Sequence, residues 1–222
     1  ANVACALRKL KIDSMFIGRL GSDDFGKKFI TKFKELKVNL DFLQLDNDLL
    51  TRVVNVDRDQ FGDRFFSGFE ASSHSYFADE VLSKKSIEKE IFNLEKYFLE
   101  TEYLVTGTIL LSSQISAETI VFLLEKAKKF EVKIVIDLNW REVFWDYSSF
   151  SSEISKTEIV NLIKNFLNHA HLLKLAKEEA TLFFECENPS QISQQMPKRP
   201  DVIITDGKNP VAWHINGLQG TT

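Results

Sequence analysis

The stretch IVIDLNWREVFW (residues 134–145) decides the fold class. It begins as a short apolar run typical of a buried strand, and an acid, an amide and a guanidinium group follow at Asp137, Asn139 and Arg141. Polar side chains placed directly after such a strand lie at its carboxyl end, where parallel α/β sheets bind ligands. The three residues therefore predict a ligand-binding edge rather than an ordinary loop with a helix cap and a surface arginine.

Apolar strands and amphipathic helices alternate on both sides of this stretch. Strands are expected at 103–105, 133–136, 171–174 and 202–205, and helices at 87–99, 116–130, 153–167 and 177–185. This alternation indicates βαβ units, which form a mostly parallel sheet with right-handed crossovers. Such a sheet would bring four polar or flexible strand ends to one edge: Thr106–Gly107, Asp137–Asn139, Lys174 and Thr205–Gly207.

The N-terminal part has a different pattern. Its apolar spacing predicts a helix over 1–12, a strand over 15–17 and an amphipathic helix over 24–37. Asp23 precedes the second of these helices and is either its N-cap or, with the surrounding glycines, part of the wall of a binding site. Residues 41–70 alternate β-branched and aromatic residues around a turn near 60–62, which predicts a hairpin apart from the main sheet. The final residues, 216–222, have the composition of a turn.

Composition narrows the possible function classes. The 222 residues carry a formal net charge of −4, and the sequence pI is about 5.7. No basic excess favours nucleic acid as a partner, and the longest apolar runs are far too short to cross a bilayer. Cys5 and Cys186 lack the spacing of a zinc site, which indicates ordinary thiols in a reducing compartment. With no signal-peptide pattern at the start, the sequence predicts a cytoplasmic protein.

Several segments, taken in order, resemble motifs of the ribokinase-like (PfkB) carbohydrate kinases over nearly the whole chain. They are ANVACALRKL, FIGRLGSDDFGKKF, GDRFF, IDLNWREVFW, LKLAKEEA and VIITDGKNP. The resemblance is strongest to fructokinase-like members. It implies a Rossmann-type three-layer α/β sandwich, with a mostly parallel central sheet, helices on both faces and a small β lid near 41–70. Residues 1–222 would then form a single, incomplete kinase domain.

The resemblance implies ATP-dependent phosphorylation of a sugar hydroxyl, most closely that of a fructokinase. It also implies ATP and Mg²⁺ as cofactors, with K⁺ as an additional candidate, and a homodimer formed through the β lid. The family carries its general base in a D-T-x-G-A-G-D motif, which does not occur in residues 1–222. This segment is therefore expected to be inactive by itself.

The resemblance also assigns roles to single residues. The catalytic candidates are Asp137, Asn139 and Arg141, and the sugar-binding candidates are Asn2, Arg64, Phe66 and Arg141. The nucleotide-binding candidates are Lys174, Thr205 and Gly207, and the metal-binding candidate is Glu179. Within this set, Asp137 could orient the guanidinium group of Arg141, which offers a planar fork to phosphate oxygens or sugar hydroxyls. The family has asparagine at the position of Ala176, a departure that weakens a direct metal role for Glu179.

Purely structural roles for two of these residues also remain open. Arg64 could be a solvated charge on an edge strand, and Glu179 could be an acid favoured at a helix N-terminus. Two further readings of the chain also remain. It could be a non-catalytic fructokinase-like interaction protein, or another doubly wound nucleotide-binding protein outside the family.

Overall fold

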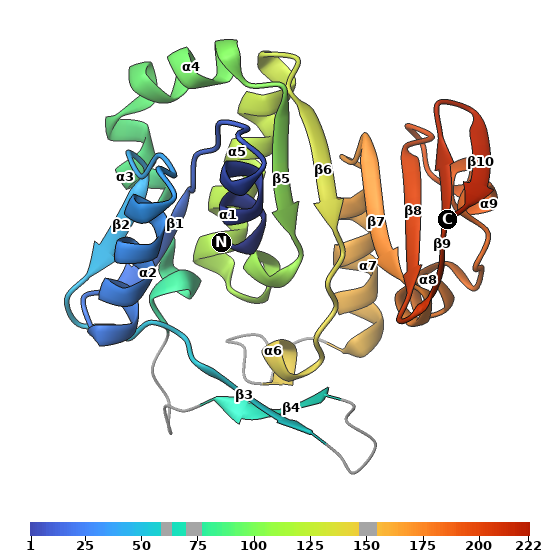
Figure 1. Cartoon of the computed structure of the whole chain (residues 1–222), viewed down its shortest axis with the longest axis horizontal. Coiled ribbons are helices and arrows are strands. Elements are labelled where there is room, and N and C mark those ends of the chain that lie inside the picture. Colours follow the sequence, from blue (N-terminus) through green and yellow to red (C-terminus); the bar gives the residue numbers. More distant parts are fainter. Residues whose placement is uncertain (59–63, 70–76, 147–154) are drawn as a thin grey trace. The chain divides into compact units, whose positions relative to one another are not determined.

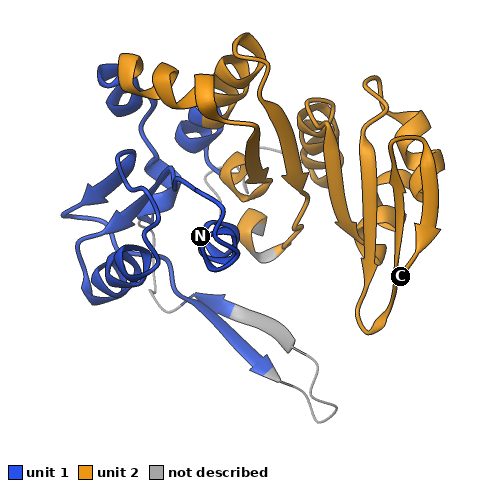
Figure 2. Ribbon diagram, turned by 45° about the horizontal axis from the view of Figure 1, so that its top comes forward, with its two compact units in different colours: residues 1–90, 113–119 blue, residues 91–112, 120–222 orange. Residues whose placement is uncertain are grey.

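The computed structural model divides the chain into two compact units (Figure 2). Unit 1 comprises residues 1–90 and 113–119, and unit 2 comprises residues 91–112 and 120–222. The structure describes residues 1–58, 64–69, 77–146 and 155–222. In these ranges, no helix has the length and apolar character needed to cross a bilayer.

Unit 1 combines short strands with helices around a small apolar core. Its elements are α1 (Asn2–Lys9), β1 (Gly18–Gly21), α2 (Asp24–Glu35), β2 (Leu43–Asp46), β3 (Val54–Arg58), β4 (Arg64–Phe69), the 3-10 helix η1 (Ala78–Val81), α3 (Lys84–Lys89) and the first turns of α5 (Gln114–Lys129). Strands β1 and β2 pair in parallel, whereas β3 and β4 form an antiparallel hairpin. One cluster of buried core side chains consists of Ala4, Leu20, Phe33 and Val38. The predicted hairpin is therefore confirmed, and its predicted turn near 60–62 lies outside the described residues.

The first strand of unit 1 corrects the sequence prediction. The strand was expected at 15–17, but Met15 forms only an isolated bridge with Asn39, and the paired strand is β1. Glycine permits this shift, since a Cβ atom on Gly18 would lie 2.5 Å from the ring of Phe16. The apolar pattern alone could not reveal that the ring packs over the strand that follows it.

Asp23 holds two backbone segments of unit 1 together. Its Oδ1 accepts a hydrogen bond from Gly26 N at 2.7 Å, and its Oδ2 accepts one from Thr51 N at 2.6 Å. The first bond caps helix α2, as the cap interpretation predicted. Burial raises the pKa of Asp23, but the hydrogen bonds from the backbone and from the Thr51 side chain together outweigh burial, and the pKa lies below its ordinary value.

We expect Asp23→Ala to lower the free energy of unfolding by about 2 to 3 kcal/mol, because it removes a helix cap and leaves the Thr51 amide without its acceptor. Urea denaturation of the full-length protein measures the change. The control is Asp24→Ala, because that side chain is 88% exposed and its change should stay within about 0.5 kcal/mol. Equal effects of the two substitutions would contradict the structural role of Asp23.

Unit 2 is built on a six-stranded sheet with the order β10-β9-β8-β7-β6-β5 (Figure 1). Its strands are β5 (Tyr103–Gly107), β6 (Lys133–Asp137), β7 (Leu172–Ala176), β8 (Asp201–Asp206), β9 (Asn209–Ile215) and β10 (Leu218–Thr221). Its helices are α4 (Ile91–Glu100), η2 (Ile109–Ser112), the larger part of α5 (Gln114–Lys129), α6 (Val143–Asp146), α7 (Lys156–Leu167), α8 (Lys177–Phe184) and α9 (Pro189–Gln195). Strands β5 to β8 run parallel, so the predicted alternation and the mostly parallel sheet are confirmed.

Burial alternates along the parallel strands. Ile134 and Ile136 on β6, and Leu173 and Leu175 on β7, are almost fully buried. Because β5 to β8 follow one another in order across the sheet, right-handed crossovers place their connecting helices on one face, which these apolar residues meet. The intervening residues point to the other face and are only half-buried, and Asp137 and Lys174 are among them. The strand pattern thus decides which side chains are available at the edge of the sheet.

Helix α9 and strands β9 and β10 of unit 2 were missing from the prediction, as were the short helices η2 and α6. Helix α9 begins after Asn188, whose side chain accepts a hydrogen bond from Gln191 N, and it has a proline at its start. The last segment, expected to be a turn, is the β9–β10 hairpin, with Asn216 at φ 51° and Gly217 at φ 77°. Asn-Gly is the typical two-residue hairpin turn, so the signal was present in the sequence. Helix α9 has only seven residues, too few for a clear periodic pattern.

The neutral side chain of His171, directly before β7, forms a hydrogen bond with the backbone of β6. Its Nδ1 accepts a hydrogen bond from Ile134 N at 2.9 Å, which a protonated Nδ1 could not do. Burial, followed by the charges of Lys198 and Lys133, lowers the pKa of His171 below its ordinary value of 6.5. A lowered pKa in the folded state means that the unfolded chain binds more protons, so stability is lost as the pH falls below about 6.5.

We therefore expect His171→Asn, whose Oδ1 can still accept the bond, to weaken the dependence of stability on pH. Urea unfolding of the full-length protein at several values between pH 7.5 and 5 should show a steeper loss for the wild type than for the variant. Parallel curves for the two proteins would rule out this contribution of His171.

Candidate functional site

The carboxyl ends of the parallel strands in unit 2 bring most of the predicted site residues to one edge. In the pairing register, Gly107 on β5 lies opposite Asp137 on β6, which lies opposite Lys174 on β7. Ala176, at the end of β7, lies opposite Thr205 on β8. Figure 1 shows these strand ends in sequence along the same side of the sheet. The edge therefore collects polar groups from strands far apart in the sequence.

Asp137 and Lys174 form an ion pair across this edge. The carboxylate Oδ1 lies 3.0 Å from Lys174 Nζ, and the side chains are 39% and 35% exposed. Asp137 was expected to orient Arg141, and the structure corrects this. The two partners occupy register positions on the same face of adjacent strands, whereas Arg141 lies beyond the turn that follows β6.

A sharp turn after β6 sets the position of Arg141. Asn139 adopts φ 48°, in the left-handed region that asparagine tolerates better than most residues. The guanidinium Nη1 of Arg141 donates a hydrogen bond to Trp140 O at 2.6 Å and lies 3.9 Å from Glu179 Oε1. The side chain stays 36% exposed. Arg141 thus has a defined orientation while its outer face remains open to solvent.

Glu179 joins the turns that follow β6 and β7. Its Oε1 accepts a hydrogen bond from Trp140 N at 2.6 Å, and its Oε2 accepts one from Ala176 N at 2.7 Å. The residue is only 6% exposed. Burial raises the pKa of Glu179, outweighing the two backbone donors and the nearby charges of Lys174 and Arg141. Glu179 therefore orders the edge through backbone contacts, in line with its alternative reading as a residue of a helix N-terminus.

Aromatic residues support the same turn from behind. Trp140 stacks on Trp145 with ring centroids 5.8 Å apart, and it meets Phe183 edge-on at 5.6 Å. Phe144 and Trp145 are 6% and 3% exposed. Their role is packing, and aromatic pairs of this geometry keep the backbone of the turn in place.

Thr108 and Gly107 complete the edge, and the first of these was not predicted. Thr108 is buried, and its Oγ1 donates a hydrogen bond to Leu138 O at 2.5 Å, directly before Asn139. A Cβ atom on Gly107 would lie 3.1 Å from Asp137 O, so glycine allows β5 and β6 to end close together. The only sequence signal for Thr108 is its position just after a strand.

Two nucleotide-binding candidates, Thr205 on β8 and Gly207 directly after it, lie at the far side of this edge. Thr205 Oγ1 donates to Leu175 O at 3.3 Å, and Gly207 has φ 53° with open space where a Cβ atom would be. Between them, Asp206 pairs with Lys177 at 3.3 Å, and Lys177 also lies 3.4 Å from Glu187. A charged network therefore adjoins the turn between β8 and β9.

The remaining candidates lie in unit 1. Asn2 is the first residue of α1 and is exposed, and Arg64 and Phe66 lie on β4. The structure thus brings together the seven candidates of unit 2: Asp137, Asn139, Arg141, Lys174, Glu179, Thr205 and Gly207.

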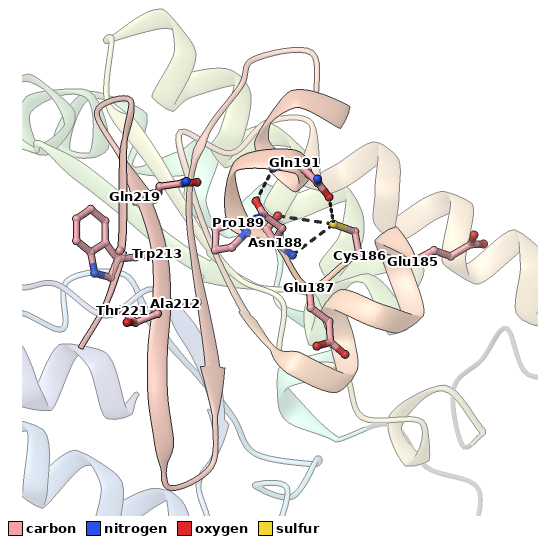
Figure 3. A pocket seen from close by; sticks show the side chains of 11 residues that line it. Glu185, Cys186, Glu187, Asn188, Pro189, Gln191, Ala212, Trp213, Gln219 and Thr221 are labelled. Carbon is pink, nitrogen blue, oxygen red and sulfur yellow. Dashed lines mark hydrogen bonds between the residues drawn. The ribbon is translucent and has the colours of Figure 1, made fainter.

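Within the described residues, the edge coincides neither with a metal cluster nor with the open hollow that unit 2 contains. Among the residues that the structure describes, no group of three or more His, Cys, Asp or Glu side chains could hold a metal ion. An open hollow of about 750 Å³ lies between the α8–α9 connection and strands β9 and β10 (Figure 3). Its cysteine, Cys186, accepts a hydrogen bond from Asn188 N and lies 3.2 Å from Gln191 Oε1. The hollow contains none of the predicted site residues.

Comparison with known proteins gives related sequences. "Probable fructokinase-5" of Arabidopsis thaliana is 26% identical over 223 residues, covering 99% of this chain and 63% of that protein. The fructokinase of Vibrio alginolyticus is 26% identical over 217 residues, covering 97% of this chain and 64% of that protein. The chain therefore spans slightly less than two thirds of the length of these relatives.

Solved structures have the same fold. The fructokinase of Xylella fastidiosa gives a TM-score of 0.80 at 23% identity, covering 100% of this chain and 66% of that chain. The fructokinase of Vibrio cholerae O395 in its fructose, ADP and calcium ion bound form gives 0.79 at 23% identity, with the same coverage. These similarities confirm the predicted ribokinase-like α/β fold. The family model described as "pfkB family carbohydrate kinase" matches residues 1–220, and the chain therefore belongs to the pfkB family of carbohydrate kinases.

Proposed function

We propose that the full-length protein is an ATP-dependent kinase that phosphorylates a hydroxyl group of fructose. One observation carries the proposal: in a chain of the pfkB family, a single sheet edge holds the Asp137–Lys174 ion pair, the oriented Arg141 and the buried Glu179. The fructose and ADP bound to the related Vibrio cholerae fructokinase support the choice of sugar and nucleotide.

Phosphoryl transfer depends mainly on positioning and on neutralising the charge of the phosphates. Arg141 presents its guanidinium fork to phosphate oxygens, and its hydrogen bond to Trp140 O fixes the direction of that fork. At the other end of the edge, the backbone of Thr205 and Gly207 approaches the nucleotide, since glycine permits close contact. The family resemblance assigns sugar binding to Asn2, Arg64, Phe66 and Arg141. In the family, the general base belongs to a D-T-x-G-A-G-D motif, which does not occur within residues 1–222.

The residues of the edge fit a Mg²⁺ ion held largely by phosphates and water. Each carboxylate oxygen of Glu179 accepts one backbone hydrogen bond and keeps a lone pair for a metal-bound water. Mg²⁺ usually binds through one or two carboxylates and substrate phosphates while retaining several waters. Glu179 and Asn139 are therefore the residues that would hold the ion, which neutralises phosphate charge when bound. K⁺ stays an additional candidate.

The test is a kinase assay on the full-length protein with ATP, Mg²⁺ and separate sugars, including fructose, glucose and ribose. We expect ADP release that depends on fructose, and a phosphorylated fructose product identified by mass spectrometry. A folded protein that binds neither ATP nor fructose would overturn the proposal and favour the non-catalytic interaction protein. The proposed homodimer through the lid near 41–70 is tested separately by light scattering, and a monomer at micromolar concentration would exclude it.

A further inference from the structure

Lys177 occupies a position that is unfavourable for a cation. It is the first residue of α8, directly after the N-cap residue Ala176. The N-terminus of a helix carries partial positive charge, so basic side chains are favoured at the opposite end. The acids that follow, Glu178 and Glu179, are the type expected there. The presence of a lysine therefore calls for a reason outside the helix.

That reason lies in two carboxylates from other segments of unit 2. Lys177 Nζ lies 3.3 Å from Asp206 Oδ2, at the end of β8, and 3.4 Å from Glu187 Oε2. Figure 3 shows Glu187 on the connection between α8 and α9. The hydrogen bond to Asp206, followed by the charges of Asp206 and Glu187, raises the pKa of Lys177, so the amine keeps its proton. The three side chains are 41%, 29% and 53% exposed, and ion pairs this open to water contribute little to stability.

The position of Asp206 explains why its ion pair with Lys177 matters for nucleotide binding. Asp206 stands between Thr205 and Gly207, in the turn that the proposed function assigns to the nucleotide. A carboxylate at this point would repel the phosphates of ATP, because like charges at short range raise the free energy of binding. Lys177 offsets that charge from the adjacent strand end.

We propose that Lys177 is a positioning residue for the nucleotide, which neutralises Asp206 and so allows the turn at 205–207 to accept a polyphosphate. The proposal rests on the proposed function and adds the electrostatic element of ATP recognition at the end of β8. It assigns Lys177 no contact with the reacting atoms. Its effect should therefore appear in ATP affinity and be nearly absent from the turnover rate.

The experiment compares ATP affinity in variants of the full-length protein by titration calorimetry, with KM and kcat measured in parallel. Lys177→Met should raise the Kd and KM for ATP about tenfold, or about 1.4 kcal/mol, while kcat and the KM for fructose change less than about twofold. Asp206→Asn should bind ATP at least as tightly as the wild type. The double variant, with both charges removed, should recover to within about threefold of the wild type.

Glu187→Gln is the matched control, because it removes the other partner of Lys177 and leaves the Asp206 pair intact; ATP affinity should change less than about twofold. The defect of Lys177→Met should also shrink at high salt. Unchanged ATP affinity in Lys177→Met, or no recovery in the double variant, would overturn the inference alone. A wild type that binds ATP without phosphorylating fructose would overturn the proposed function, and the calorimetric comparison would still decide the role of Lys177. A wild type that binds no ATP would overturn both.

Discussion

Replacing Gly26 with alanine is expected to lower the free energy of unfolding by roughly 3 to 5 kcal/mol. Gly26 lies in the first turn of α2 and is buried. A Cβ atom there would fall well inside contact distance of Gly21 O and would lie 3.0 Å from Thr51 Oγ1. The end of β1 and the start of α2 would have to separate, although both are tied to Thr51 through hydrogen bonds.

Helix propensity predicts the opposite sign for this substitution. In an unobstructed helix, glycine to alanine stabilises by about 1 kcal/mol, so the measured direction decides between propensity and steric exclusion. Urea denaturation of the full-length protein gives the value. Lys28→Ala on the exposed side of the same helix serves as the control and should change stability by less than about 0.5 kcal/mol. A stabilising effect of Gly26→Ala would show that the backbone of unit 1 adapts without cost.

Arg141→Ala should reduce kcat with fructose by about 100- to 1,000-fold, the range found when a preorganised donor to a developing charge is lost. The guanidinium is oriented by Trp140 O and is partly exposed at the proposed phosphate edge. Arg141→Lys should recover only a small part of the activity, since an ammonium group keeps the charge but lacks the planar fork.

The stability of Arg141→Ala shows whether a loss of activity comes from catalysis or from unfolding. The carboxylate Oε1 of Glu179 lies 3.9 Å from Arg141 Nη1, which is a weak pair at 36% exposure of the arginine side chain. The free energy of unfolding should therefore change by less than about 1 kcal/mol in Arg141→Ala. If kcat stayed within a few-fold of the wild type, the assignment of Arg141 to the phosphates would be wrong.

The parallel part of the sheet could be predicted because its signal is local. Each of the strands β5 to β8 has a short apolar run followed by a polar or flexible residue, and each is joined to the next by a periodic helix. The same rule located the edge where the seven candidates of unit 2 meet. Strand β1, by contrast, begins and ends with glycine, and its pairing with β2 depends on a residue range more than twenty positions away.

The sequence predicted which residues lie at the edge of the sheet better than it predicted which of them pair with one another. Asp137 was expected to orient Arg141, which is close in sequence, but the strand register places Asp137 opposite Lys174 on the neighbouring strand. The two backbone contacts of Glu179 were also hidden, because an acid at a helix start has the same sequence pattern whether it bonds to one turn or to two. Such contacts arise from strand order, which single-residue patterns do not encode.

The double contact of Glu179 has a consequence for which substitutions the edge tolerates. Both of its donors are main-chain amides, so the bonds are indifferent to the side chains carried at positions 140 and 176. Alanine can therefore stand at 176 without loosening the join. Proline is the one natural amino acid that would break either bond, because it alone brings no amide hydrogen. Residues 140 and 176 can therefore be substituted by any residue except proline without losing the hydrogen bonds that join the two turns, provided that Glu179 is kept.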